Sequence, residues 1–138
     1  MLMCNEFIFV GVICMKAREK AIADYFNSWI RKDISVIENT FSPDAVYVES
    51  WGPAYRNLVD IRKWFNEWNK DNTVLQWDIV GFLHQDDICV CEWYFKCECD
   101  NNVSGFNGVS VVEFDTDGKI VFLKEFQSKY PNYYPYEN

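Results

Sequence analysis

Apolar residues in the first half of the chain recur at three- and four-residue steps in three separate stretches, which is the period of an amphipathic helix. This pattern predicts a first helix over residues 17–31, a short second helix after Asp33 and a third helix after Asn57. Asp and Asn are residue types that cap helix N-termini with their side chains. The third helix carries a wide stripe of large apolar side chains, which needs an equally apolar surface to cover it: Leu58, Ile61, Trp64, Phe65 and Trp68.

The rest of the chain is rich in strand-forming residues. A short strand is predicted at residues 45–49, and longer strands near 74–84, 87–99, 103–115 and 119–128. Turn-forming residues separate the four long strands, and short turns force antiparallel pairing. We therefore predict an α+β fold in which a cone-shaped, curved antiparallel sheet wraps around three N-terminal helices. Such a cone encloses an internal pocket, the usual setting of a small-ligand site.

Charge and length narrow the classes of partner. The chain has 138 residues, a length that fits one domain with its own core. It carries 13 basic and 21 acidic residues, a net charge of −8. A negative field of this size repels phosphate backbones and acidic lipid surfaces. We therefore expect neither nucleic acid nor a membrane as a partner.

The N-terminal segment is expected to lie outside the domain. Residues 7–15 are apolar, but nine residues are too few to span a bilayer, and no basic residue precedes them as in an export signal. Met15 also stands immediately before the first predicted helix. We expect residues 1–14 to be an extension, residues 15–130 to form the domain, and residues 131–138 to be a Tyr/Pro-rich tail. Without an export signal, a cytoplasmic protein with reduced cysteines is expected.

Four of the six cysteines lie on the strand near residues 87–99. Alternation places Cys89, Cys91, Cys97 and Cys99 on one face of that strand, together with Trp93. The two cysteine pairs are then about 20 Å apart at the rise of an extended strand, too far for one tetrahedral ion. We interpret these cysteines as small buried hydrophobic residues and expect no metal and no other cofactor.

Three segments together resemble a known family. They are YFNSWIRKDISVIENTFSPDAVYVES (25–50), WGPAYRNLVDIRKWFNEW (51–68) and FNGVSVVEFDTDGKIVFLKEF (106–126). In order and spacing they are similar to the nuclear transport factor 2-like superfamily, in particular its SnoaL-like and ketosteroid-isomerase-like branches. The family usually has Gly at the position of Asn57, and Asn tolerates positive φ better than most residues.

The resemblance implies three candidate catalytic residues. It places Tyr25 at the position of an oxyanion donor, Glu49 at that of the general base and Ser110 at that of a second donor. Glu49 is one methylene longer than the family's Asp, and Ser110 replaces a protonated Asp, so steroid isomerisation itself is not expected. The resemblance implies instead a related isomerase, cyclase or dehydratase reaction without a cofactor.

Large rings near the expected mouth of the cone are candidates for contact with a small apolar ligand: Trp51, Tyr55, Trp68 and Trp93. The alternative is that these rings are ordinary core, which we favour for Trp64. His84 is interpreted as a surface turn residue, and Glu113 and Glu125 as parts of a charged outer face. A non-catalytic ligand-binding or dimerising module on the same fold remains the second hypothesis. The family also implies a homodimer formed through the outer sheet face.

Overall fold

The structure, a computed structural model, describes residues 2–137, with side chains from residue 11 onward. It contains three helices and six strands, and the predicted order of helix, helix, strand, helix and four-strand meander is confirmed. One three-residue strand after the first was not predicted. The elements are α1 (Leu2–Arg31), α2 (Ile34–Thr40), β1 (Phe41–Val48), β2 (Ala54–Arg56), α3 (Leu58–Asp71), β3 (Asn72–Gln85), β4 (Ile88–Cys99), β5 (Asn102–Phe114) and β6 (Ile120–Lys129).

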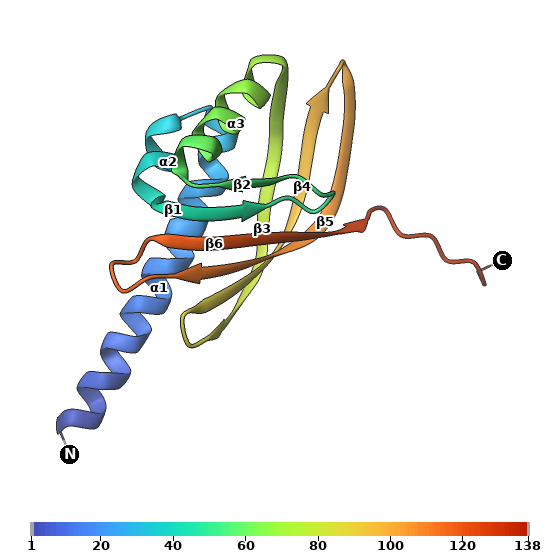
Figure 1. Ribbon diagram of the computed structural model, residues 1–138. Coiled ribbons are helices and arrows are strands. Elements are labelled where there is room, and N and C mark those ends of the chain that lie inside the picture. Colours follow the sequence, from blue (N-terminus) through green and yellow to red (C-terminus); the bar gives the residue numbers. More distant parts are fainter. Residues whose placement is uncertain (1, 138) are drawn as a thin grey trace.

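The six strands form one curved sheet in the order β2-β1-β6-β5-β4-β3, with the helices on its concave side (Figure 1). The α+β cone is therefore confirmed. The prediction of a wholly antiparallel sheet was wrong at one place, because β1 and β6 run parallel. No short turn joins these two strands, so turn chemistry could not reveal their relative direction. The pairing nevertheless decides which side chains of β1 and β6 lie next to each other.

Curvature of the sheet comes partly from β3. Its pairing with β4 shifts register twice, between Val74 and Gln76 and between Ile79 and Gly81. Extra residues of this kind bend a strand and increase its twist. The partner strand β4 keeps a regular alternation, and the predicted inward face is confirmed by the burial of Cys89, Cys91, Trp93 and Cys97.

Helix α1 is longer than predicted. It begins at Leu2 and runs without a break to Arg31, and its N-terminal half projects beyond the sheet (Figure 1). The helix crosses residue 14 without a break. The boundary that we expected there, between an extension and the domain, stays a prediction. Within residues 2–137, no helix is long and apolar enough to cross a membrane.

Both predicted helix caps are confirmed. Asp33 accepts a hydrogen bond from the Ser35 backbone N–H at 3.0 Å, and Asn57 Oδ1 accepts one from the Asp60 backbone N–H at 3.0 Å. Asn57 has a φ of 77°, in a region that glycine occupies readily and other residues rarely do. This cap fixes the start of α3, and so the places of the two tryptophans on that helix.

His84 is not the surface turn residue that we predicted. It lies within β3 and is mostly buried, with Nε2 3.8 Å from the Glu19 carboxylate and 3.9 Å from Cys89 Sγ. The reason is that α1 packs against the concave side of β3, so the end of that strand is covered.

Candidate functional site

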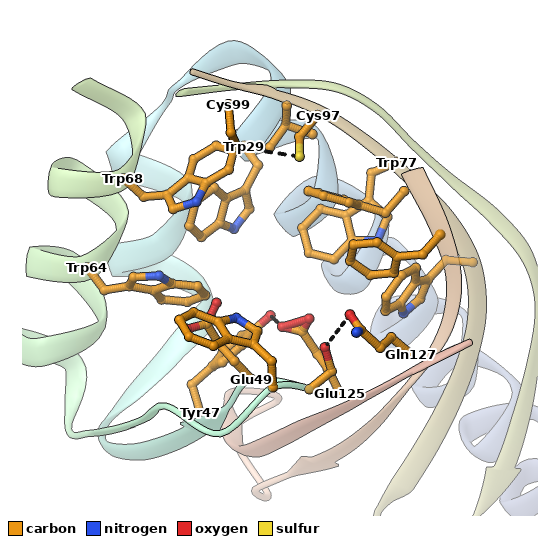
Figure 2. Close-up of a pocket in the computed structure, with 16 residues that line it drawn as sticks. Trp29, Tyr47, Glu49, Trp64, Trp68, Trp77, Cys97, Cys99, Glu125 and Gln127 are labelled. Carbon is orange, nitrogen blue, oxygen red and sulfur yellow. Dashed lines mark hydrogen bonds between the residues drawn. The ribbon is translucent and has the colours of Figure 1, made fainter. Parts of the chain in front are cut away.

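A cavity of about 180 Å³ opens at the wide end of the cone. It is bounded by the last turns of α1, by α3, by the segment after β1 and by the concave faces of β3 to β6 (Figure 2). All six tryptophans of the chain are among its lining residues. The complete lining is Trp29, Tyr47, Glu49, Ser50, Trp51, Trp64, Trp68, Val74, Trp77, Trp93, Phe95, Cys97, Cys99, Phe106, Glu125 and Gln127.

Two carboxyl groups, those of Glu49 and Glu125, lie on one side of this cavity (Figure 2). Glu49 follows the end of β1, and Glu125 lies in β6, the parallel neighbour of β1. Each is held by a tyrosine hydroxyl. Tyr47 donates to Glu125 Oε1 at 2.5 Å, and Tyr55 donates to Glu49 Oε2 at 2.7 Å. We name this group of two carboxyls and two hydroxyls the acidic floor of the cavity.

Burial changes the ionisation of Glu125. Protein surrounds its carboxyl on nearly every side, and loss of hydration raises its pKa to about 8. The hydrogen bond from Tyr47 opposes this shift, whereas the nearby Glu49 carboxylate adds to it. A carboxyl with this pKa is mostly protonated near neutral pH. It can then donate a hydrogen bond or a proton, as an ordinary surface glutamate cannot.

Glu49 is less enclosed than Glu125. Burial raises its pKa as well, and the hydrogen bond from Tyr55 counteracts the shift. The backbone around it is fixed, since the Glu49 N–H donates to the Pro53 carbonyl at 2.9 Å across the turn between β1 and β2. The two carboxyls thus have different surroundings within one cavity, an arrangement by which enzymes separate an acid from a base.

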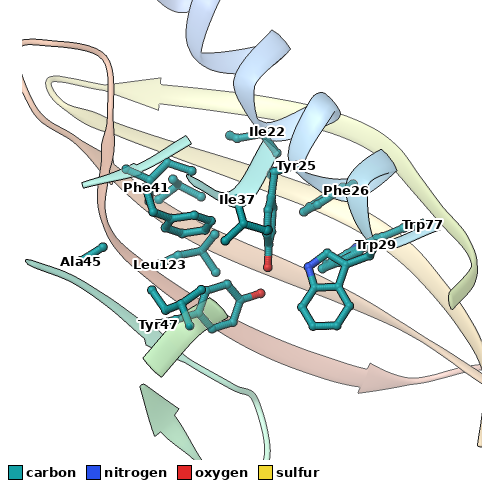
Figure 3. Packing of buried hydrophobic residues seen from close by; sticks show 14 of the residues in the cluster. Ile22, Tyr25, Phe26, Trp29, Ile37, Phe41, Ala45, Tyr47, Trp77 and Leu123 are labelled. Atoms are coloured by element: carbon teal, nitrogen blue, oxygen red, sulfur yellow. The ribbon is translucent and has the colours of Figure 1, made fainter. Parts of the chain in front are cut away.

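Tyr25 lies behind the cavity. It is fully buried in the core, close to Tyr47 and Phe41, and it is not among the lining residues (Figure 3). Its hydroxyl has no hydrogen-bond partner within the described part of the chain. Burial, and then the charge of Glu125, raise its pKa well above the usual value, so it stays protonated.

Ser110 is also buried and also absent from the lining. Its Oγ accepts a hydrogen bond from Trp93 Nε1 at 2.9 Å. The Trp93 ring passes directly over Gly108, where an added Cβ would come within 2.2 Å of it. The indole therefore needs glycine at this position. The Ser110 hydroxyl, which the resemblance offered as a donor, is buried outside the cavity lining and holds the Trp93 ring instead.

Three of the four predicted ligand-binding rings line the cavity: Trp51, Trp68 and Trp93. The fourth, Tyr55, does not line it but supports it, since Tyr55 stacks on Trp64 with ring centroids 4.5 Å apart and also holds Glu49. Trp64, which we interpreted as core, borders the cavity as well. Trp51 is 69% exposed and marks the mouth.

Sequence reasoning missed Glu125 and Tyr47. The placement of Glu125 on a charged outer face was wrong, whereas Glu113 is exposed as expected. A signal was available in the alternation of β6. Leu123, Glu125 and Gln127 share its inner face, and Phe126 is 50% exposed on the other. An apolar Phe beside a charged Glu suggested the opposite orientation.

Two thiols complete the wall opposite the acidic floor. The Sγ atoms of Cys97 and Cys99 lie 3.6 Å apart, and both residues line the cavity. Among the described residues, no three or more histidines, cysteines or acidic residues are grouped so that they could hold a metal ion. The expectation of a site without a metal stays a prediction.

Comparison with known proteins gives the family. The family model of the SnoaL-like domain matches residues 22–123. No curated protein matches the chain in sequence. Among solved structures, the chain is similar to an LEH-like epoxide hydrolase of Mycobacterium tuberculosis, with a TM-score of 0.74 and 14% identity over 82% of this chain and 84% of that one.

Two further structures have the same fold. One is a protein of Catenulispora acidiphila with a ketosteroid isomerase-like fold, in complex with trimethylamine, with a TM-score of 0.69 and 12% identity over 77% of this chain and 83% of that one. The other is a candidate SnoaL-like polyketide cyclase of Mesorhizobium loti, with a TM-score of 0.64 and 14% identity over 78% and 97%. At such identities the likeness shows the fold alone. Since the family model covers most of the chain, the protein belongs to the SnoaL-like domain family, on the nuclear transport factor 2-like fold.

Proposed function

We propose that the protein is a cofactor-independent enzyme that moves protons on a small, largely apolar substrate held in the cavity. Glu49 acts as the general base. Glu125, protonated near neutral pH, acts as the hydrogen-bond or proton donor. Isomerisation, cyclisation and dehydration all need a proton removed at one atom and charge stabilised at another, and this pair supplies both functions.

The observation that carries the proposal is the acidic floor. Two carboxyls face one apolar cavity, and the more deeply buried one has its pKa raised to about 8. Placing unpaired carboxyls in a poorly hydrated site costs stability, so such an arrangement is typical of functional sites. Paired acids with different environments divide the roles of acid and base in several enzyme classes.

The tyrosines position this pair. The Tyr47 hydroxyl holds one oxygen of Glu125, and the other carboxyl oxygen accepts no hydrogen bond from the described residues. That second oxygen is the one available to a substrate. In this proposal Glu125 takes the donor role that the resemblance gave to Tyr25 and Ser110, while Tyr25 packs against Tyr47 from the core.

Glu49 distinguishes the enzyme from a non-catalytic module. A module would leave this carboxylate in open water at a strand end. Instead it lines the cavity and is held by Tyr55 at 2.7 Å, and burial raises its pKa. A base with a raised pKa is stronger than a solvated carboxylate at the same pH.

The proposal is tested by measuring turnover of candidate substrates. Purified protein is assayed against small apolar epoxides, unsaturated ketones and carbon acids, with product detected by mass spectrometry. For any substrate that is converted, Glu49→Gln should lower kcat by about 10²- to 10⁴-fold, the usual contribution of a general base. Glu113→Gln, at an exposed position of β5, is the matched control and should leave kcat unchanged. Conversion that survives Glu49→Gln would contradict the proposal.

A further inference from the structure

The cavity contains negative charge without a positive partner. Its described lining includes the carboxyls of Glu49 and Glu125 but no lysine, arginine or histidine. Neither carboxyl takes part in an ion pair with any described residue, although four other ion pairs are present. The side-chain groups that hold them are neutral: the tyrosine hydroxyls at both carboxyls, and Trp51 at Glu49. A carboxylate that is partly removed from water, as Glu49 is, normally has a cation beside it, and the described lining does not supply one.

The opposite wall adds to this negative potential. Aromatic rings carry a negative face, which attracts cations, and tryptophan is the strongest of them. All six tryptophans border the cavity. Their N–H groups are the parts that would favour an anion, but the Trp93 N–H donates to Ser110 and Trp51 bonds Glu49. The Nε1 atoms of Trp29 and Trp77 are buried, without a hydrogen-bond partner among the described residues.

The tryptophans also stand at angles to one another, as the walls of a box do. The ring of Trp29 meets that of Trp64 at 57° and that of Trp68 at 78°, with centroids 4.8 Å and 5.5 Å apart. A flat aromatic ligand is best held between parallel rings. Tilted rings instead surround a rounded group, which is the shape of an alkylated ammonium.

We propose that the substrate of this cavity is a small organic cation, an amine or a quaternary ammonium with an apolar body, held between the tryptophan box and the acidic floor. The ammonium supplies the missing counter-charge of Glu49, the apolar body covers the indole carbons, and Glu125 stays the neutral donor of the floor. A carboxylate or phosphate ligand would meet like charge on the floor and no cation on the wall.

This inference rests on the proposed function, because it names the substrate class of the same cavity. A cationic nitrogen also suits the proposed reaction. It withdraws electrons from the neighbouring carbon and so makes a C–H bond there more acidic toward a carboxylate base. Binding and turnover nevertheless depend on different measurements, so either idea can fail alone.

The test uses three probes of similar size: benzyltrimethylammonium, its neutral carbon isostere neopentylbenzene, and the phenylacetate anion. Binding to the purified full chain is followed by tryptophan fluorescence, which reports on the cavity since every tryptophan lines it. The cation should bind at least about 10-fold more tightly than the isostere, the sum expected of cation–π and charge attraction. The anion should bind more weakly than the isostere.

Two variants separate the two walls. Glu49→Gln removes floor charge and should reduce the preference for the cation over the isostere by about 10-fold. Trp68→Leu removes one wall of the box and should reduce it by about 3-fold while the variant stays folded by circular dichroism. Glu113→Gln is the control and should change neither affinity.

Equal binding of cation and isostere, or no binding of any probe, would overturn the inference. Either result would leave the proton-transfer proposal standing for a neutral substrate if Glu49→Gln still abolishes turnover. Conversely, a clear preference for the cation together with turnover that survives Glu49→Gln would support the ligand class and reject the catalytic role.

Discussion

The narrow and the wide ends of the cone are built on the same strands but are packed differently. At the narrow end, Ile22, Tyr25, Ile37 and Phe41 are at most 2% exposed and lie together in one buried cluster (Figure 3). At the wide end, the tryptophans leave a cavity of about 180 Å³. Strand β6 passes from one end to the other, with Leu123 fully buried.

The difference shows how one scaffold separates stability from function. Branched aliphatic and phenyl side chains interdigitate and leave few voids. Large indoles held at angles cannot close-pack in the same way, and the carboxyls between them keep their need for hydration or a partner. Two residues along β6, the sheet changes from Leu123, which stabilises the fold, to Glu125, which weakens it near neutral pH. The narrow end thus offsets the cost of the wide end.

The largest predicted effect is the difference in stability loss when one side chain is shortened at each end of the cone. Leu123→Ala should lower the free energy of unfolding by about 2–5 kcal/mol, because it opens a void in a filled core. Gln127→Ala, four residues further along the same face, should cost less than about 1 kcal/mol, the net value of its one hydrogen bond with Ser50. Urea unfolding followed by circular dichroism measures both. Similar losses would show that the wide end is packed as firmly as the narrow one.

The loss of stability that Glu125 causes at the wide end should depend on pH. The pKa of Glu125 is raised in the folded protein, from an ordinary 4.5 to about 8. Between these values the unfolded chain has lost its proton and the folded chain has kept it, so stability falls as pH rises from about 4.5 to about 8. Glu125→Gln, which retains a neutral group bonded to Tyr47, should be more stable than the natural protein at pH 8 by about 4 kcal/mol.

That advantage should disappear near the ordinary carboxyl pKa, where Glu125 is protonated in both states. Glu113→Gln is again the matched control and should show no such pH dependence, since this residue is exposed. If the stability advantage of Glu125→Gln over the natural protein were no larger at pH 8 than at about pH 4, Glu125 would be ionised in the folded protein and could not serve as the donor.

The smallest predicted effect concerns the start of α3, the helix that places Trp64 and Trp68. Asn57→Ala should destabilise the protein by about 1 kcal/mol, because it removes the cap on the Asp60 N–H. Asn57→Gly should be neutral or stabilising, since glycine adopts the observed φ of 77° without strain and is itself an acceptable cap. Thermal unfolding of the two variants measures the difference. If glycine lowered the stability as much as alanine does, the explanation that the positive φ strains the backbone at position 57 would be contradicted.

Most of the fold could be predicted, and about half of the site. The caps at Asp33 and Asn57, the long strands and the inward face of β4 all followed from local patterns. Glu49 was expected at the pocket from the resemblance, and Trp51 and Trp68 from their place near the expected mouth, and all three line the cavity. Glu125 was missed because its neighbour Phe126 is the more apolar of the two, and a single strand does not show which of its faces is covered.

The sequence by itself determined the helix starts, the turns and the two-residue alternation, because each depends on residues within a few positions of one another. Only the tertiary structure decided that β1 runs parallel to β6, that Glu125 rather than Phe126 faces inward, and that Glu49 and Glu125 share one cavity. These choices depend on packing between segments roughly 75 residues apart, where burial of the whole sheet outweighs the preference of any one side chain.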